Sequence, residues 1–71
     1  MRVLIIDDDF FITTALKTIL ESDSGIQVCG SGKNGKEAVT LYDSLRPDIL
    51  LMDIRMEEMD GLAASAEILA L

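Results

Sequence analysis

The sequence predicts a small α/β domain built on a three-stranded parallel sheet. Two short apolar runs, at residues 3–6 and 49–52, have the unbroken hydrophobic character of strands buried on both faces. A third run, at residues 26–29, alternates apolar and polar residues, which is typical of a less buried edge strand. Helical patterns separate the runs, so the element order is βαβαβα. This element order demands a parallel sheet with right-handed crossovers, and placing the more polar strand at the edge and the two apolar strands inside gives the strand order 2-1-3.

These elements account for the 71 residues as one domain. We expect strands at about residues 2–7, 26–30 and 49–53, and helices at about residues 10–21, 35–45 and 61–71.

Candidate N-caps precede all three helices, namely Asp9, Asn34 and Asp60. The first helix has apolar residues at the spacing of one buried face: Ile12, Ala15, Leu16, Ile19 and Leu20. The glycines of residues 30–35 predict a flexible turn before the second helix.

Composition excludes several classes of function. Thirteen acidic and six basic residues give a net charge of −7, with no basic block that would bind a nucleic acid backbone. The chain has no histidine and a single cysteine, Cys29, which excludes an internal disulfide, the usual zinc sites and a Ser-His-Asp triad. No apolar stretch is long enough for a membrane span or a signal peptide, so we expect a cytoplasmic protein that does not bind membranes.

Carboxylates follow both apolar strands. Asp7 and Asp8 come after the first strand and Asp53 ends the third. In the order 2-1-3 these two strands are neighbours, and the crevice between their carboxyl ends is a topological switch point where such sheets bind ligands. Three converging carboxylates repel one another unless a proton or a hard cation neutralises them. The sequence therefore predicts a Mg²⁺ site, in which Asp7 and Asp8 hold the metal and Asp53 is a nucleophile toward phosphorus.

Other functions remain as alternatives. Helix capping explains Asp9 and Asp60, but at most one residue of the Asp7, Asp8 and Asp53 set. Residues 30–35 match the dinucleotide motif G-x-G-x-x-G, and nearly match a P-loop except for Glu37 at the position of the Ser or Thr that binds Mg²⁺. A Mg²⁺-dependent phosphatase usually has a second acid where Arg55 stands.

The motifs taken together resemble the receiver domain of bacterial two-component response regulators. They are VLIIDDD at residues 3–9, NGKEA at 34–38, RPDILLMDIRM at 46–56 and MDG at 59–61. The resemblance covers the whole chain and implies the flavodoxin-like fold. Relative to that fold the chain is expected to be the N-terminal part of a receiver domain, a truncated (βα)₃ unit that lacks strands 4 and 5.

The resemblance also implies roles for particular residues. Asp53 matches the phosphorylated aspartate, and Asp7, Asp8, Asp53 and the backbone carbonyl of Arg55 match the Mg²⁺ ligands. The expected function is a signalling domain rather than an enzyme, with only weak self-catalysed phosphoryl transfer and dephosphorylation. A sensor histidine kinase would donate the phosphoryl group.

Residues 26–30 and 46–48 most resemble the branch with a C-terminal helix-turn-helix domain. That branch regulates transcription and would contact DNA only through the further domain.

Two departures from the family qualify this expectation. Glu57 stands where the family usually has proline, and the family's Ser or Thr after strand 4 and Lys after strand 5 have no counterpart. In addition, nothing in the chain covers the outer edge of the strand at residues 49–53. We expect this edge to pair with a second copy, or copies to exchange segments. The alternative function is thus a truncated or engineered fragment that folds by self-association and cannot be phosphorylated.

Overall fold

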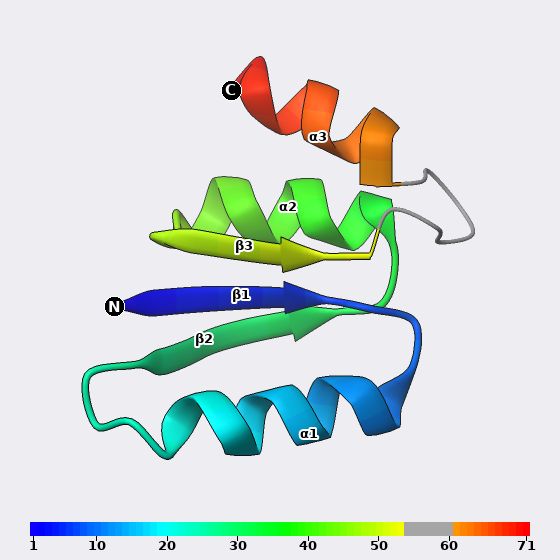
Figure 1. Cartoon of the computed structure of the whole chain (residues 1–71). Coiled ribbons are helices and arrows are strands. Elements are labelled where there is room, and N and C mark those ends of the chain that lie inside the picture. Colours follow the sequence, from blue (N-terminus) through cyan, green and yellow to red (C-terminus); the bar gives the residue numbers. More distant parts are fainter. Residues whose placement is uncertain (54–60) are drawn as a thin grey trace.

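A computed structural model describes residues 1–53 and 61–71 of the chain. Its strands are β1 (Arg2–Ile6), β2 (Gln27–Gly32) and β3 (Ile49–Met52), which form a parallel sheet in the order β2-β1-β3 (Figure 1). The predicted fold class and strand order are therefore confirmed. The more polar strand, β2, lies at the edge, because the apolar residues Val3 to Ile6 of β1 gain most from neighbours on both sides.

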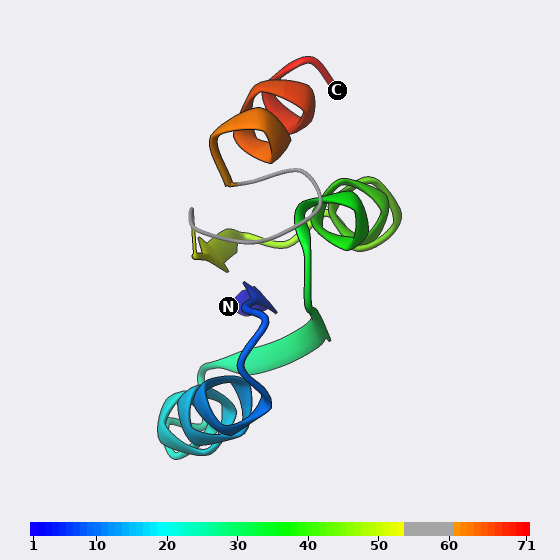
Figure 2. The same ribbon diagram turned by 90° about the vertical axis from the view of Figure 1, so that its right-hand side faces the viewer.

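The described helices are α1 (Phe10–Glu21), α2 (Gly35–Leu45) and α3 (Gly61–Leu69). Helix α1 lies on one side of the sheet, close to β2, and α2 and α3 lie on the other side (Figure 2). None of the described helices is long and apolar enough to cross a membrane. The predicted cap at Asp60 falls in residues 54–60, outside the described residues.

The core is centred on β1. Its residues from Val3 to Ile6 are at most 2% exposed. Leu4 and Ile6 pack with Ala38 of α2 and Ala64 of α3 in one apolar cluster. Burying an aliphatic side chain of this size contributes about 1.5–3 kcal/mol to folding, so β1 supplies much of the stability of this small domain.

Helix α1 is less buried than its sequence pattern indicated. Ile12 and Ile19 are 45% and 66% exposed, and no residue of α1 is buried. Ala15 is exposed as well, whereas Leu16 and Leu20 are half-buried. The prediction of one buried face was therefore wrong for Ile12, Ala15 and Ile19. The reason is geometric: α1 lies beside the edge strand β2, so only one row of side chains reaches the sheet.

Strand β3 is only partly covered. Leu50 and Met52 pack against the cluster under α2, whereas Ile49 and Leu51 on the opposite face are 39% and 37% exposed. Within residues 1–53 and 61–71, β1 is the only strand paired with β3. An apolar sequence typical of a central strand is therefore found at an edge.

The glycines of β2 allow close packing of α2. A Cβ on Gly30 would lie 2.8 Å from Leu45 Cδ1, and one on Gly32 would lie 2.9 Å from Ile6 Cδ1 and 3.0 Å from Glu37 Cβ. No described glycine has a positive φ. The prediction of a flexible glycine turn was wrong for Gly30 and Gly32, because both belong to the strand. A Cβ on either glycine would meet side chains of α2, so close packing of that helix accounts for both residues without the dinucleotide or P-loop alternatives.

Replacing Gly32 with alanine is expected to lower the free energy of unfolding by about 1–3 kcal/mol, because the added methyl group overpacks the contact between β2 and α2. Urea denaturation followed by circular dichroism measures the change. Gly25→Ala is the matched control, because the added methyl group would have Asp23 Oδ1 at 3.3 Å as its nearest neighbour. Equal stability of the two variants would contradict this account of Gly32.

Candidate functional site

Three carboxylates meet at the carboxyl edge of the sheet. Asp7 and Asp8 directly follow β1, and Asp53 directly follows the neighbouring strand β3. One side-chain oxygen from each residue lies within 4.8 Å of the others. Asp7 and Asp53 are half-buried, and Asp8 is exposed. The structure thus brings together the three side chains that the strand-end argument placed at this edge.

Backbone hydrogen bonds hold these residues in place. The Asp7 N–H donates to the Gly32 carbonyl oxygen at 3.1 Å, and the Asp53 N–H donates to the Ile6 carbonyl oxygen at 3.1 Å. Hydrogen bonding between the strands therefore extends one residue past β1 and β3. The backbone at Asp7 and Asp53 is positioned by the same interactions that form the sheet.

Asp9 connects this site to helix α1. Its Oδ1 accepts from the N–H groups of Phe11 at 2.9 Å and Ile12 at 3.3 Å, which confirms the predicted N-cap. The Asp9 N–H in turn donates to Oδ1 of Asp7 at 2.9 Å. The sequence pattern predicted the cap but not the hydrogen bond to Asp7, because a contact two residues away leaves no periodic signal.

The donor set suits Mg²⁺. This ion takes oxygen ligands at about 2.1 Å, so two oxygens on the same ion lie within about 4.2 Å of each other. The observed limit of 4.8 Å is close enough for small side-chain rotations to close the site. Carboxylates are hard ligands, and the arrangement leaves positions for water or a phosphoryl oxygen. The fourth expected ligand, the backbone carbonyl of Arg55, falls outside the described residues.

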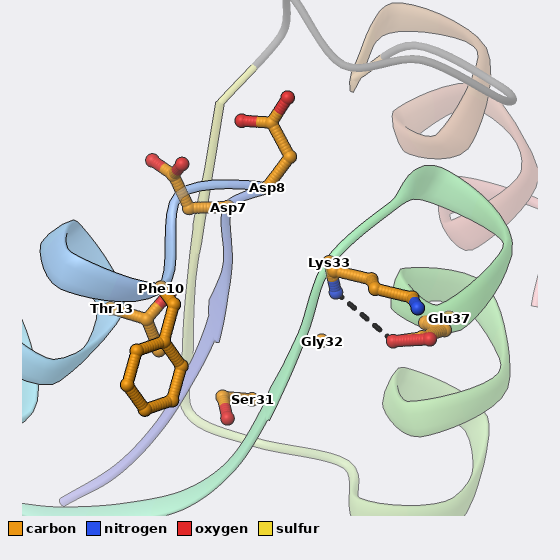
Figure 3. A pocket seen from close by; sticks show the side chains of 8 residues that line it. All are labelled: Asp7, Asp8, Phe10, Thr13, Ser31, Gly32, Lys33 and Glu37. Atoms are coloured by element: carbon orange, nitrogen blue, oxygen red, sulfur yellow. Dashed lines mark hydrogen bonds between the residues drawn. The ribbon is translucent and has the colours of Figure 1, made fainter.

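A pocket of about 440 Å³ lies beside Asp7 and Asp8, with Phe10, Ser31 and Lys33 among its lining residues. The Asp7 and Asp8 carboxylates point away from the Lys33 side chain, which extends toward Glu37 of α2 (Figure 3). The Lys33 N–H donates to Glu37 Oε1 at 3.0 Å, which fixes the start of α2. Between the described residues, no ion pair joins Lys33 to Asp7 or Asp8.

The fold and site define a class: small α/β domains with an acidic site at the carboxyl edge of a parallel sheet in the order 2-1-3. The family model described as "Response regulator receiver domain" matches residues 3–71. The chain belongs to this family.

Two similar proteins support the assignment to the receiver family. The chain is 47% identical over 70 residues to the chemotaxis protein CheY of Listeria monocytogenes, and the aligned residues are 99% of this chain and 58% of that protein. It is 45% identical over 69 residues to a protein-glutamate methylesterase/protein-glutamine glutaminase of Alkalilimnicola ehrlichii, covering 97% of this chain and 18% of the relative.

Solved structures agree. The response regulator domain of Thermotoga maritima CheB matches with a TM-score of 0.96 and 38% identity, covering 99% of this chain and 52% of that chain. CheY in a CheX-CheY-BeF3-Mg²⁺ complex from Borrelia burgdorferi matches with a TM-score of 0.91 and 33% identity, covering 99% and 53%. The chain thus spans about half the length of these receiver structures.

Replacing Asp8 with asparagine is expected to raise the free energy of unfolding by about 1 kcal/mol at low ionic strength without Mg²⁺. Two unit charges about 5 Å apart in water repel by about this amount, and the substitution removes one of them. The gain should shrink as salt is added. Added Mg²⁺ should stabilise the original chain more than the variant, since a ligand is lost. Equal stabilisation of both by Mg²⁺ in thermal denaturation would contradict a metal site at Asp8.

Proposed function

We propose that the chain is a phosphoacceptor module of a two-component system that takes a phosphoryl group on Asp53 with Mg²⁺ bound. The proposal rests on one observation: three carboxylates lie within 4.8 Å of one another at adjacent strand ends, in a chain of the receiver family. Asp7, Asp8, Asp53 and the Arg55 carbonyl would hold the ion. The Borrelia burgdorferi CheY complex, which contains Mg²⁺, supports this assignment.

Asp53 is the best nucleophile of the three. Asp7 and Asp8 both follow β1, and Asp8 is the most exposed of the three. Asp53 follows the neighbouring strand β3 and matches the position of the family's phosphorylated aspartate, so we assign it the nucleophilic role. When bound, Mg²⁺ would offset the negative charge on the transferring group.

In the proposed step, a carboxylate oxygen of Asp53 attacks phosphorus of a phosphohistidine on a sensor histidine kinase. The new P–O bond forms as the P–N bond breaks, and the electron pair of that bond stays on the imidazole nitrogen, which then takes up a proton. The aspartyl phosphate later loses its phosphoryl group to water. The chain acts as a signalling domain, with only weak self-catalysed transfer and dephosphorylation.

The cellular location, domain extent and output of the chain are the next points of the proposal. We propose a cytoplasmic location and a receiver domain over residues 1–71. The helix-turn-helix output stays a prediction, since the relatives reported above are named as a chemotaxis protein and a methylesterase. The alternative of a fragment that cannot be phosphorylated is not favoured, because the candidate phosphoacceptor and both acidic metal ligands are brought together within this chain.

Incubation with Mg²⁺ and acetyl phosphate is expected to add one phosphate to the chain, detected by intact mass spectrometry. The adduct should disappear in Asp53→Asn, because the amide is a far weaker nucleophile than the carboxylate. Asp23→Asn is the matched control, since Asp23 is an exposed aspartate in the turn after α1. The proposal fails if the original chain gains no phosphate, or if the adduct persists in Asp53→Asn.

We also propose that the outer edge of β3 pairs with a second copy of the chain. The exposed apolar residues Ile49 and Leu51, beside backbone groups with no strand partner among the described residues, support this.

A dimer or larger species is expected in multi-angle light scattering at about 0.1 mM, a concentration at which micromolar affinity suffices for association. Leu51→Lys should shift the chain toward monomer, because a charged lysine opposes strand pairing at an edge. Leu62→Lys should leave the mass unchanged, since Leu62 lies on α3 and is 69% exposed. A monomeric original chain would refute the pairing.

A further inference from the structure

We propose that Asp9 is a positioning residue for the metal site: by capping α1 it holds the backbone N–H that orients the Asp7 carboxylate. This inference rests on the proposed function and extends it to a residue outside the cluster of Asp7, Asp8 and Asp53.

Asp9 makes hydrogen bonds both to the first turn of α1 and to Asp7. Its side chain accepts from the N–H groups of Phe11 and Ile12, and its carbonyl oxygen accepts from the Thr13 N–H at 3.1 Å and from Thr13 Oγ1 at 3.2 Å. Its own N–H donates to Asp7 Oδ1 at 2.9 Å. One residue thus binds the first turn of the helix on one side and a candidate metal ligand on the other.

The cap matters more than usual because α1 has little other anchorage. No residue of α1 is buried, and its apolar residues Ile12 and Ile19 are largely exposed. A helix held by burial keeps its first turn in place when a cap is lost, whereas a weakly packed helix frays there. Loss of the Asp9 cap is therefore expected to free the Asp9 N–H as well.

A freed N–H would leave the Asp7 carboxylate free to rotate. The hydrogen bond engages Oδ1 only, so the second oxygen of Asp7 remains available to a cation. Hydrogen bonds that orient ligating carboxylates affect metal affinity strongly, typically by 10–100-fold on removal. Because this bond comes from a backbone group whose position depends on the cap, we expect the lower end of that range.

The charge of Asp9 has a separate role. Its carboxylate faces the N–H groups of the first turn of α1, where the helix macrodipole stabilises negative charge. Among the described residues, the acids close enough together to share an ion are Asp7, Asp8 and Asp53, and Asp9 does not belong to this group. We therefore assign the effect of Asp9 to its hydrogen bonds, and an asparagine with the same acceptor oxygen should replace it.

Coupling between two sites is reciprocal, so metal binding should also stabilise the cap. An ion that holds Asp7 in one orientation favours its hydrogen bond with the Asp9 N–H. Exchange of the Phe11 and Ile12 amides with solvent should then slow on addition of Mg²⁺. The Glu37 amide offers an internal comparison, because Asn34 Oδ1 caps it at 2.8 Å in the first turn of α2.

The test is titration calorimetry with Mg²⁺ on the full chain and three variants. Asp9→Ala should bind Mg²⁺ about 10-fold more weakly. Asp9→Asn should stay within about threefold of the original chain, since the asparagine oxygen keeps the cap. Asn34→Ala removes the equivalent cap of α2 and should leave Mg²⁺ affinity within about twofold, since Asn34 has no bond to the cluster.

Three results would overturn the positioning role of Asp9. They are an unchanged Mg²⁺ affinity in Asp9→Ala, a loss of affinity in Asp9→Asn as large as that in Asp9→Ala, and a loss in Asn34→Ala as large as that in Asp9→Ala. If the original chain does not bind Mg²⁺, both the proposed function and this inference are overturned. If the original chain binds Mg²⁺ and any of these three results is found, only this inference is overturned.

Hydrogen exchange on the original chain gives an independent check if Asp9→Ala does not fold. Protection of Phe11 and Ile12 that rises with Mg²⁺ by a larger factor than protection of Glu37 supports the proposal. An equal rise at all three amides, or no rise, overturns it.

Discussion

The site depends on backbone hydrogen bonds that continue past the ends of β1 and β3. Through them the Asp7 N–H reaches Gly32 and the Asp53 N–H reaches Ile6, so the backbones that carry these acids are fixed by sheet pairing. Carboxylates about 5 Å apart repel by about 1 kcal/mol per pair in water. Burial of Val3 to Ile6 in β1, whose side chains are at most 2% exposed, offsets that repulsion many times over. The core of the domain thus holds together three carboxylates that would move apart if they were on mobile loops.

The two faces of the sheet are covered unequally. On one face, Gly30 and Gly32 let α2 approach closely, and Ala38 and Ala64 complete a cluster around Leu4 and Ile6. On the other face, α1 contributes no buried residue. Since weakly packed elements open most readily, α1 is the described helix most able to respond to a change at the site. It is also the helix that Asp9 joins to Asp7.

The chain spans about half the length of the receiver structures it matches, yet it contains the candidate phosphoacceptor and both candidate acidic metal ligands. These acids all follow β1 or β3, the two neighbouring strands at the switch point of the sheet. The three candidate side chains are therefore concentrated at one place in the sheet. In contrast, the exposed Ile49 and Leu51 of β3 show that the sheet is not fully covered by the described residues.

Much of this protein could be predicted from its sequence. Unbroken apolar runs identified two strands, and helical spacing identified the crossovers. The more polar pattern of residues 26–29 put the remaining strand at the edge, which makes neighbours of the strands that carry Asp7, Asp8 and Asp53. Those properties are local or follow from general chain geometry. Only the tertiary structure decided which neighbour each side chain meets. It showed that Gly30 and Gly32 make room for α2, that Ile12 and Ile19 lie outside the core, and that the Asp9 N–H bonds Asp7. These features depend on the distance between packed elements, and a sequence pattern specifies the direction of a side chain but not that distance.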